Sequence, residues 1–182
     1  MRKLIVSEFV SLDGVMEAPD EWHLQFWHDA MGEYKLEEVL ASGALLLGRV
    51  TYEGFAEAWP SVTDEAGFAD KMNSMPKFVV STTLDDAEWN NSTVLKGNVV
   101  EEVSKLKEQP GDPILVAGSA DLVQTLMEHD LVDEYRLMVH PVVVGSGKRL
   151  FTDGSDAKKL RLVESRALGP DVVNLTFEPA AG

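Results

Sequence analysis

Apolar and polar positions along the chain alternate between short buried runs and stretches with helical spacing, which is typical of an α/β protein. The clearest example is Ile114 to Leu126, where an apolar run meets a Gly-Ser-Ala turn and continues with Leu122, Val123 and Leu126. This spacing predicts a buried strand followed by a helix that begins at about Ser119. The free N–H groups of such a helix start form an anion site. An ordinary strand-to-helix turn with nothing bound explains the stretch equally well.

The same order of apolar strand, glycine and helix start occurs at Ala44 to Ala58. Here Arg49 can bind a phosphate with two N–H groups, and Thr51 adds a hydroxyl. Alternatively, Arg49 pairs with a carboxylate and Thr51 only caps the helix. Another apolar run, Lys77 to Ser81, also ends in hydroxyl residues. Because these strand ends carry similar groups, we expect them to surround one cleft at Gly48, Ser81 and Gly118.

The remaining spacing predicts further strands and helices between these turns. They are a strand at 3–10, a helix from 20 to 40, a short helix at 65–75, a strand at 92–96, a helix at 99–109 and a strand at 134–144. Pro141 inside the last strand indicates a bulge or an edge position. Two alternating runs at 160–167 and 172–178 predict a closing antiparallel hairpin. We therefore expect a single domain over residues 1–182, a three-layer α/β fold with a mixed, mostly parallel sheet.

Aromatic side chains crowd the helix predicted from Asp20. Trp22 and Phe26 lie one helical turn apart and are candidates to wall a pocket for a flat ring. Aromatic residues at helical spacing are also common in a hydrophobic core, which is the simpler interpretation.

The composition excludes several classes of function. The chain has 31 acidic against 16 basic residues and a formal net charge of −15, which disfavours nucleic acid and anionic membranes as partners. The absence of cysteine excludes disulfides, Cys-based zinc sites and thiol catalysis, and the histidines show no metal-ligand spacing. Ser119 lacks the G-x-S-x-G pattern of a serine hydrolase. Apolar runs are too short to cross a membrane and the first residues lead directly into a strand, so we expect a cytoplasmic protein.

Several motifs resemble a known fold family. The segments LLLGRVTYEGF at 45–55, KFVVST at 77–82 and ILVAGSADL at 114–122 resemble the cofactor-binding strands of the dihydrofolate reductase fold. The segment LVDEYRLMVHPVVVGSGKRLF at 131–151, with SLDG at 11–14 and GPDV at 169–172, is more similar still to the C-terminal reductase domain of the bifunctional riboflavin-biosynthesis deaminase/reductase. The resemblance covers essentially the whole chain and predicts a three-layer dihydrofolate reductase-like fold.

This resemblance implies NADPH-dependent hydride transfer to a pteridine- or pyrimidine-like heterocycle, as in 5-amino-6-(5-phosphoribosylamino)uracil reductase. It implies that the pyrophosphate binds at a helix start formed by Gly118, Ser119, Ala120, Asp121 and Leu122. It places the other phosphates and the adenosine at Gly48, Arg49, Thr51, Ser81, Thr82 and Lys96, with Arg49 as the candidate for the 2′-phosphate. The nicotinamide side would be lined by the backbone of Val10 and by Asp13 and Gly14.

The substrate part of the family pattern is less complete. Val116 stands where the riboflavin reductases carry an acidic residue two before the turn glycine, and their ribityl-phosphate arginines have no counterpart between residues 53 and 64. We therefore expect an uncharged or weakly charged ring as substrate. Asp13 is the one carboxylate nominated as a proton relay or substrate anchor, with a plain turn role as the alternative.

A homodimer is implied by the resemblance and by the exposed, β-rich length predicted at 134–144. The alternative function is a non-catalytic dimeric protein of the same fold that binds a nucleotide or a flat ring without transferring hydride.

Overall fold

The apolar runs form one eight-stranded sheet with the order β4-β3-β2-β5-β1-β6-β8-β7. The computed structural model describes residues 1–182. Its strands are β1 (Leu4–Ser11), β2 (Ala44–Gly48), β3 (Lys77–Val80), β4 (Ser92–Leu95), β5 (Ile114–Ala117), β6 (Glu134–His140), β7 (Leu160–Ala167) and β8 (Val173–Pro179). All neighbours pair in parallel except β8, which is antiparallel to both β6 and β7. The mixed, mostly parallel sheet and the closing hairpin predicted from the sequence are confirmed.

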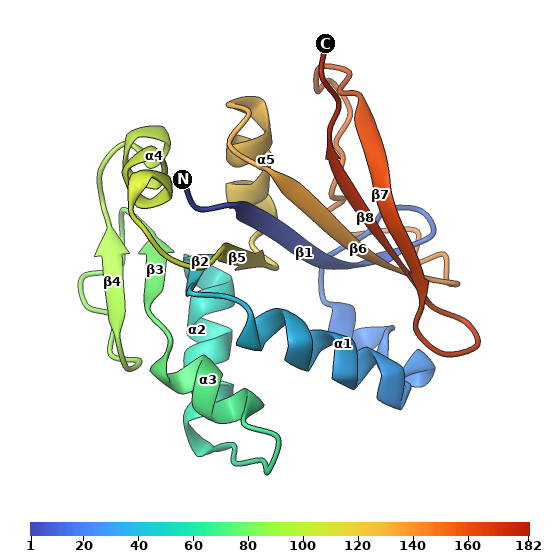
Figure 1. Cartoon of the computed structure of the whole chain (residues 1–182), viewed down its shortest axis with the longest axis horizontal. Coiled ribbons are helices and arrows are strands. Elements are labelled where there is room, and N and C mark those ends of the chain that lie inside the picture. Colours follow the sequence, from blue (N-terminus) through green and yellow to red (C-terminus); the bar gives the residue numbers. More distant parts are fainter.

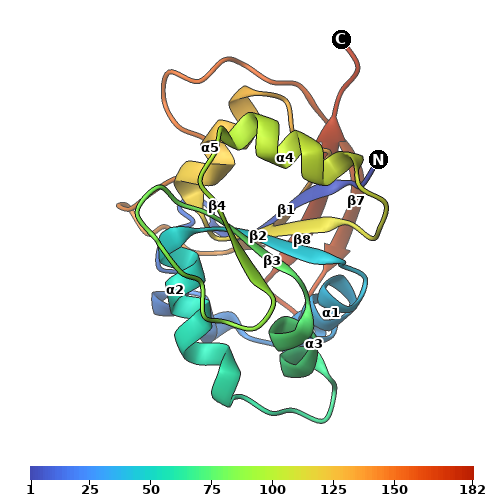
Figure 2. The same ribbon diagram turned by 90° about the vertical axis from the view of Figure 1, so that its left-hand side faces the viewer.

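Helices cover both faces of the sheet and give three layers (Figures 1 and 2). The helices are α1 (Asp29–Leu40), α2 (Arg49–Ala58), α3 (Phe68–Ser74), α4 (Val99–Glu108) and α5 (Ala120–Glu128). Helices α4 and α5 lie on one face, where the largest apolar cluster is buried. Helices α1, α2 and α3 lie on the other face over a second cluster. No helix is both long and apolar enough to cross a membrane.

The central strands differ in length, and this difference shapes the site. The pairing of β1 with β5 ends where Ser7 meets Ala117, whereas β1 and β6 stay paired as far as Ser11 and His140. Residues 8–11 therefore have a neighbouring strand on one side only. The sheet has a step at the carboxyl end of β5, and Glu8 is the first residue beyond it.

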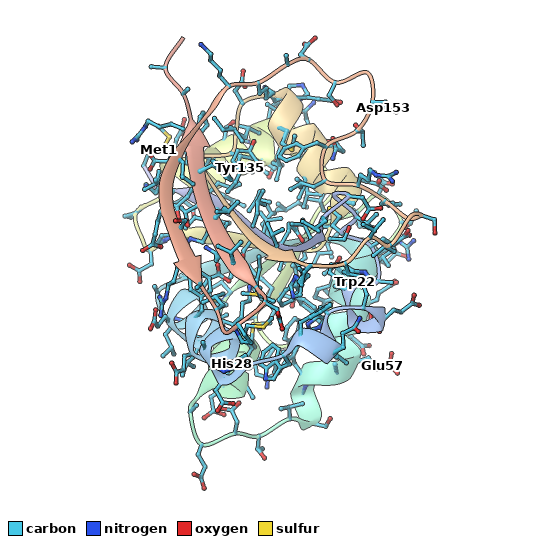
Figure 3. The ribbon with its side chains drawn as sticks, turned by 90° about the vertical axis from the view of Figure 1, so that its right-hand side faces the viewer. Met1, Trp22, His28, Glu57, Tyr135 and Asp153 are labelled. Carbon is cyan, nitrogen blue, oxygen red and sulfur yellow. The ribbon has the colours of Figure 1, made fainter.

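The helix predicted from Asp20 to Leu40 is wrong in its first half. Two short 3-10 helices, η1 (Pro19–Glu21) and η2 (Leu24–Phe26), precede α1, which begins only at Asp29. The extended backbone of His28 interrupts the helical path, and its ring accepts a hydrogen bond from the N–H of Ala30 as the cap of α1. The turn of the hairpin closes over this cap, since a Cβ on Gly169 would lie 2.7 Å from the His28 ring (Figure 3).

The prediction for the strand around Pro141 also needs correction. Strand β6 stops at His140, and it pairs with β1 on one side and β8 on the other. Pro141 therefore ends the strand instead of forming a bulge or an edge, because it has no N–H for the ladder. The helix predicted at 65–75 is likewise shorter, since α3 begins at Phe68 after the Asp64 carboxylate accepts the N–H groups of Phe68 and Ala69.

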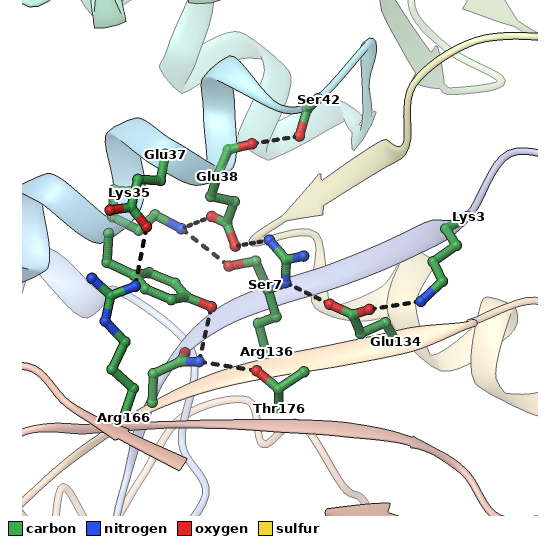
Figure 4. Close-up of polar contacts among 12 residues, drawn as sticks. Lys3, Ser7, Lys35, Glu37, Glu38, Ser42, Glu134, Arg136, Arg166 and Thr176 are labelled. Atoms are coloured by element: carbon green, nitrogen blue, oxygen red, sulfur yellow. Dashed lines mark hydrogen bonds and ion pairs between the residues drawn. The ribbon is translucent and has the colours of Figure 1, made fainter. Parts of the chain in front are cut away.

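A network of buried charges fixes α1 to the sheet (Figure 4). The Glu38 carboxylate, only 1% exposed, pairs with Lys35 on its own helix and with Arg136 on β6. Arg136 also pairs with Glu134, and Lys35 donates to the Ser7 hydroxyl on β1 at 3.1 Å. These bonds hold the Lys35 ammonium close to the step in the sheet.

Candidate active site

The carboxyl ends of β2, β3 and β5 open into one cleft of about 660 Å³. Gly48, Ser81 and Gly118 all line it, so the three predicted strand ends do surround a single cleft. The cleft also takes in most of the residues that the family resemblance nominated for the cofactor, namely Arg49, Thr51, Thr82, Ser119, Ala120, Asp121 and Leu122.

Two of the nominated cofactor residues lie outside this cleft. Val10 is 5% exposed and packs in the apolar cluster beneath α4 and α5. Lys96 pairs with Asp85 at 3.0 Å and is not among the residues that line the cleft. Their placement therefore gives no support to a direct role in cofactor binding.

Two helix starts and the hydrogen-bonded turn at Gly118 and Ser119 form the anion-binding part of the cleft. Helices α2 and α5 both begin there, and the first N–H groups of each have no acceptor within their own helix. The Gly48 N–H donates to the Ser119 hydroxyl, and the Ser119 N–H donates to the Thr51 hydroxyl, each at 2.9 Å. Gly118 and Ser119 both have positive φ angles, of 55° and 62°. This arrangement leaves the amides of residues 120–122 available to an anion.

Two cations reach the cleft, and each is paired with a carboxylate. Arg49 contacts Glu53 at 2.9 Å, which is the alternative pairing that the sequence left open. Lys148 contacts Asp121 at 3.0 Å and was not predicted, although its position directly after the Gly-Ser-Gly turn was visible in the sequence. Both cations are about half exposed, and such ion pairs contribute little free energy. A phosphate can therefore replace the carboxylate partner of each cation at a small cost in free energy.

A second cavity of about 940 Å³ lies beneath the same strand ends, against α1, α2 and α3. Its walls include the aromatic side chains of Phe9, His23, Trp27, Phe55, Trp59 and Phe68. It shares four lining residues with the first cleft, and these are Met16, Pro19, Thr51 and Gly118. The two cavities are therefore contiguous, and a ring bound in one can touch a ligand bound in the other.

Trp22 and Phe26, which the sequence nominated as walls of a ring pocket, do not line this cavity. Trp22 is 6% exposed, packs edge-on against His140 and donates its indole N–H to the Glu17 carbonyl. Phe26 also packs near His140. The 3-10 turns replace the expected α-helical turn, and they present His23 and Trp27 to the cavity instead.

The carboxyl group of Glu8 is buried beside this cavity, and the sequence analysis did not nominate Glu8 as a site residue. One oxygen accepts the Gly118 N–H at 3.0 Å, and the other is buried with no hydrogen-bond partner. Burial raises the pKa of Glu8 well above its ordinary value, although the charge of Lys35 acts in the opposite direction. The signal in the sequence was an acidic residue inside the otherwise apolar run of β1.

Asp13 has a structural role in a loop. Its carboxylate accepts hydrogen bonds from the Ser11 hydroxyl and from the N–H groups of Val144 and Gly145. These bonds lower the pKa of Asp13 to about 2, so the group is ionised at neutral pH and has no proton to give. Asp13 lines neither cavity, and the geometry supports the turn role.

Comparison with known proteins places this geometry in context. The model of the RibD C-terminal domain family matches residues 2–174. Two proteins of Bacillus subtilis (strain 168), uncharacterized protein YyaP and uncharacterized protein YwjB, are 31% and 29% identical over 97% and 94% of this chain, and 94% and 95% of their own lengths are covered.

Solved structures show the same fold. A Shewanella sp. PV-4 protein provisionally linked to riboflavin biosynthesis superposes with a TM-score of 0.78 at 20% identity, with 98% of this chain and 99% of that chain covered. The deaminase/5-amino-6-(5-phosphoribosylamino)uracil reductase of Thermotoga maritima gives a TM-score of 0.69 at 16% identity. That match covers 98% of this chain and 57% of the larger protein.

Proposed function

Because the chain belongs to the RibD C-terminal domain family, we propose that it is an NADPH-dependent reductase that transfers hydride to an uncharged or weakly charged heteroaromatic ring. The reductase-domain resemblance found in the motifs is confirmed by the family match over residues 2–174. The family supports a reductase-like function of the kind used in riboflavin biosynthesis. The cofactor and the substrate of this chain belong to the proposal.

The observation that carries the proposal is the contact between two cavities of different chemistry. One has helix starts, hydroxyls and two exposed cations, which suit the phosphates of a dinucleotide. The other has aromatic walls, which suit a flat ring. The shared residues, Met16, Pro19, Thr51 and Gly118, mark where the reactive ends of two ligands would meet.

The residues present fit a phosphorylated dinucleotide. A Cβ at Gly118 would lie 2.9 Å from the Thr51 hydroxyl, so only a glycine lets this turn pack so closely against the first turn of α2. The amides of residues 120–122 and the side chains of Arg49 and Lys148 would hold the phosphates, and Ser81 and Thr82 would bond the adenosine ribose. The bound dinucleotide supplies the hydride, while the chain provides position and excludes water.

The charge of the second, aromatic-walled cavity, called the ring cavity from here on, argues against a phosphorylated substrate. Its lining includes five carboxyl groups, from Glu8, Asp20, Asp29, Glu33 and Asp64. Lys35 is the one lysine or arginine in the lining, and the buried Glu38 already pairs with it. The net negative charge of this lining would repel a phosphate, whereas it would not repel a neutral or weakly basic ring.

Nucleotide titration followed by tryptophan fluorescence tests the proposal. We expect NADPH to bind at micromolar to low millimolar concentration. Arg49→Ala should weaken NADPH about 10-fold and NADH less than about 3-fold, because only NADPH carries a 2′-phosphate for a guanidinium to bind. Arg161→Ala is the matched control, since Arg161 pairs with Glu178 at the exposed edge strand, away from both cavities.

Each outcome has a definite consequence. Failure of both nucleotides to bind would refute the reductase proposal. Binding of NADPH without its oxidation, across a panel of pterins, flavins and quinones, would support the non-catalytic alternative instead.

A further inference from the structure

One oxygen of a buried carboxyl beside the ring cavity has no hydrogen-bond partner within the protein. Glu8 is 5% exposed, lines the cavity, and uses one oxygen to accept the Gly118 N–H. Its second oxygen is fully buried without a hydrogen bond. Buried polar atoms are almost always satisfied, and an exception beside a cavity points to a ligand that supplies the missing bond.

We propose that Glu8 is the acid that hydrogen-bonds the substrate ring through its free oxygen and donates the proton that accompanies hydride transfer. This inference rests on the proposed function, and it names a residue for the proton relay for which the sequence had nominated Asp13, with a turn role as the alternative.

The position of Glu8 follows from the step in the sheet. Strand β5 ends opposite Ser7, so no strand pairs with the backbone of Glu8 on that side. The turn at Gly118 begins there instead, and Gly118 lines both cavities. Because the carboxyl is bonded to the backbone of that turn, it is held where the ring and the dinucleotide would meet.

The surrounding charges favour the neutral acid. The groups that face Glu8 are Lys35 and Glu38 from α1 and the Gly118 N–H from the turn after β5. The positive charge of Lys35 is neutralised largely by Glu38, and Lys35 also donates to Ser7. Burial and the Glu38 charge raise the pKa of Glu8, and these effects outweigh Lys35 and the Gly118 bond. A carboxylic acid that stays protonated near neutral pH is suited to general-acid catalysis.

The step balances as a two-electron reduction of a ring C=N bond. The carbon accepts hydride from a reduced nicotinamide dinucleotide, and the electron pair of the π bond moves to nitrogen. The Glu8 O–H bond breaks as its proton passes to that nitrogen, which completes an N–H bond. The dinucleotide leaves oxidised, the ring leaves reduced, and the Glu8 carboxylate regains a proton from water before the next turnover.

The protonation state of Glu8 can be tested on the protein alone. Infrared spectra at pH 7 should contain the C=O stretch of a protonated carboxylic acid, and this band should vanish in Glu8→Gln. The matched control is Glu57→Gln, because Glu57 is exposed on α2 and lines neither cavity. This control should leave the protonated-acid band unchanged.

Ring binding and hydride transfer give the second test. Pterin should quench tryptophan fluorescence of the unmodified chain. Glu8→Gln should bind pterin within about 3-fold, because the amide keeps a hydrogen-bonding group in place, whereas Glu8→Leu should bind at least about 10-fold more weakly. With a ring that is reduced, Glu8→Gln should slow single-turnover hydride transfer by at least about 100-fold, with NADPH affinity unchanged.

The outcomes separate this inference from the proposed function. An ionised Glu8 at pH 7, equal pterin binding by Glu8→Leu in a folded protein, or no pterin binding at all would overturn the inference. If the unmodified chain binds neither NADPH nor NADH, the reductase proposal is refuted, while the infrared band and the pterin affinities still report on Glu8. A Glu8→Gln protein that transfers hydride at the normal rate would leave the reductase standing and reject Glu8 as the donor.

Discussion

Replacing Gly118 with alanine should strain the turn on which both cavities depend. Gly118 has a φ of 55°, and its new Cβ would lie 2.9 Å from the Thr51 hydroxyl oxygen and 3.1 Å from the Thr51 methyl carbon. The left-handed backbone costs an alanine about 1 kcal/mol, and relieving the overlap costs about 1–3 kcal/mol more. We therefore expect Gly118→Ala to lose about 2–4 kcal/mol of unfolding free energy, which corresponds to roughly 10 °C in Tm for a chain of this size.

The two contributions can be separated by urea unfolding of companion variants. Gly67→Ala carries the strain alone, because Gly67 has a φ of 87° and a Cβ there meets no atom within 4 Å. It should lose only about 1 kcal/mol. Thr51→Ala removes both atoms that the new Cβ would overlap, so the double variant Gly118→Ala, Thr51→Ala should be more stable than the sum of the single losses predicts by about 1 kcal/mol or more. Additive losses, or a Gly118→Ala protein as stable as Gly67→Ala, would refute this account of the turn.

Three further predictions concern other parts of the molecule. Lys77 is fully buried and its ammonium donates to three backbone carbonyls at 2.8–2.9 Å, so Lys77→Met should lose about 3 kcal/mol in urea unfolding, with little change for Lys71→Met on α3. Because the pKa of Asp13 falls to about 2 in the folded state from an ordinary 3.8, its stabilisation is present above about pH 4 and is lost as the pH falls toward 2. Asp13→Asn should flatten that part of the acid-unfolding profile, and an unchanged profile would argue against the loop anchor. Sedimentation velocity at micromolar concentration should show the homodimer expected from the family resemblance. Any contact through a strand edge must use β4 or β7, since β6 is paired on both sides.

The parts of the fold that could be predicted are those in which local spacing and burial agree. The apolar run before Gly118 predicts a buried strand, and the helical spacing of Leu122, Val123 and Leu126 predicts an amphipathic helix. Both are present. The hairpin likewise follows from alternation around Gly169, which has a positive φ. In these segments, no distant contact was needed to choose the conformation.

The errors arose where a tertiary contact decided the local structure. The spacing of Trp22 and Phe26 fits an α-helix, but Trp22 packs against His140, far along the chain, in an irregular segment. The long β-rich stretch after Glu134 was interpreted as exposed, whereas pairing with β1 and β8 places it inside the sheet. Propensity gives no information about such neighbours.

In the candidate site too, features set by local sequence were predicted, and a feature set by a tertiary arrangement was missed. The strand ends at Gly48, Ser81 and Gly118 were predicted because parallel strands place their carboxyl ends along one edge. Glu8 was missed because its position beside the cavity depends on the relative lengths of two adjacent strands, which no single segment reveals. A charged residue within an apolar, doubly covered strand is the signal that could have drawn attention to it.

The early end of β5 has a consequence for how this scaffold can be altered. Extending that strand by two residues would bring backbone amides and carbonyls opposite Glu8 and Phe9, and it would displace the turn at Gly118 that lines both cavities. If the chain is the reductase we propose, this change should abolish hydride transfer. Substitutions along the aromatic wall, by contrast, would change which molecules enter without disturbing the ladder of main-chain bonds.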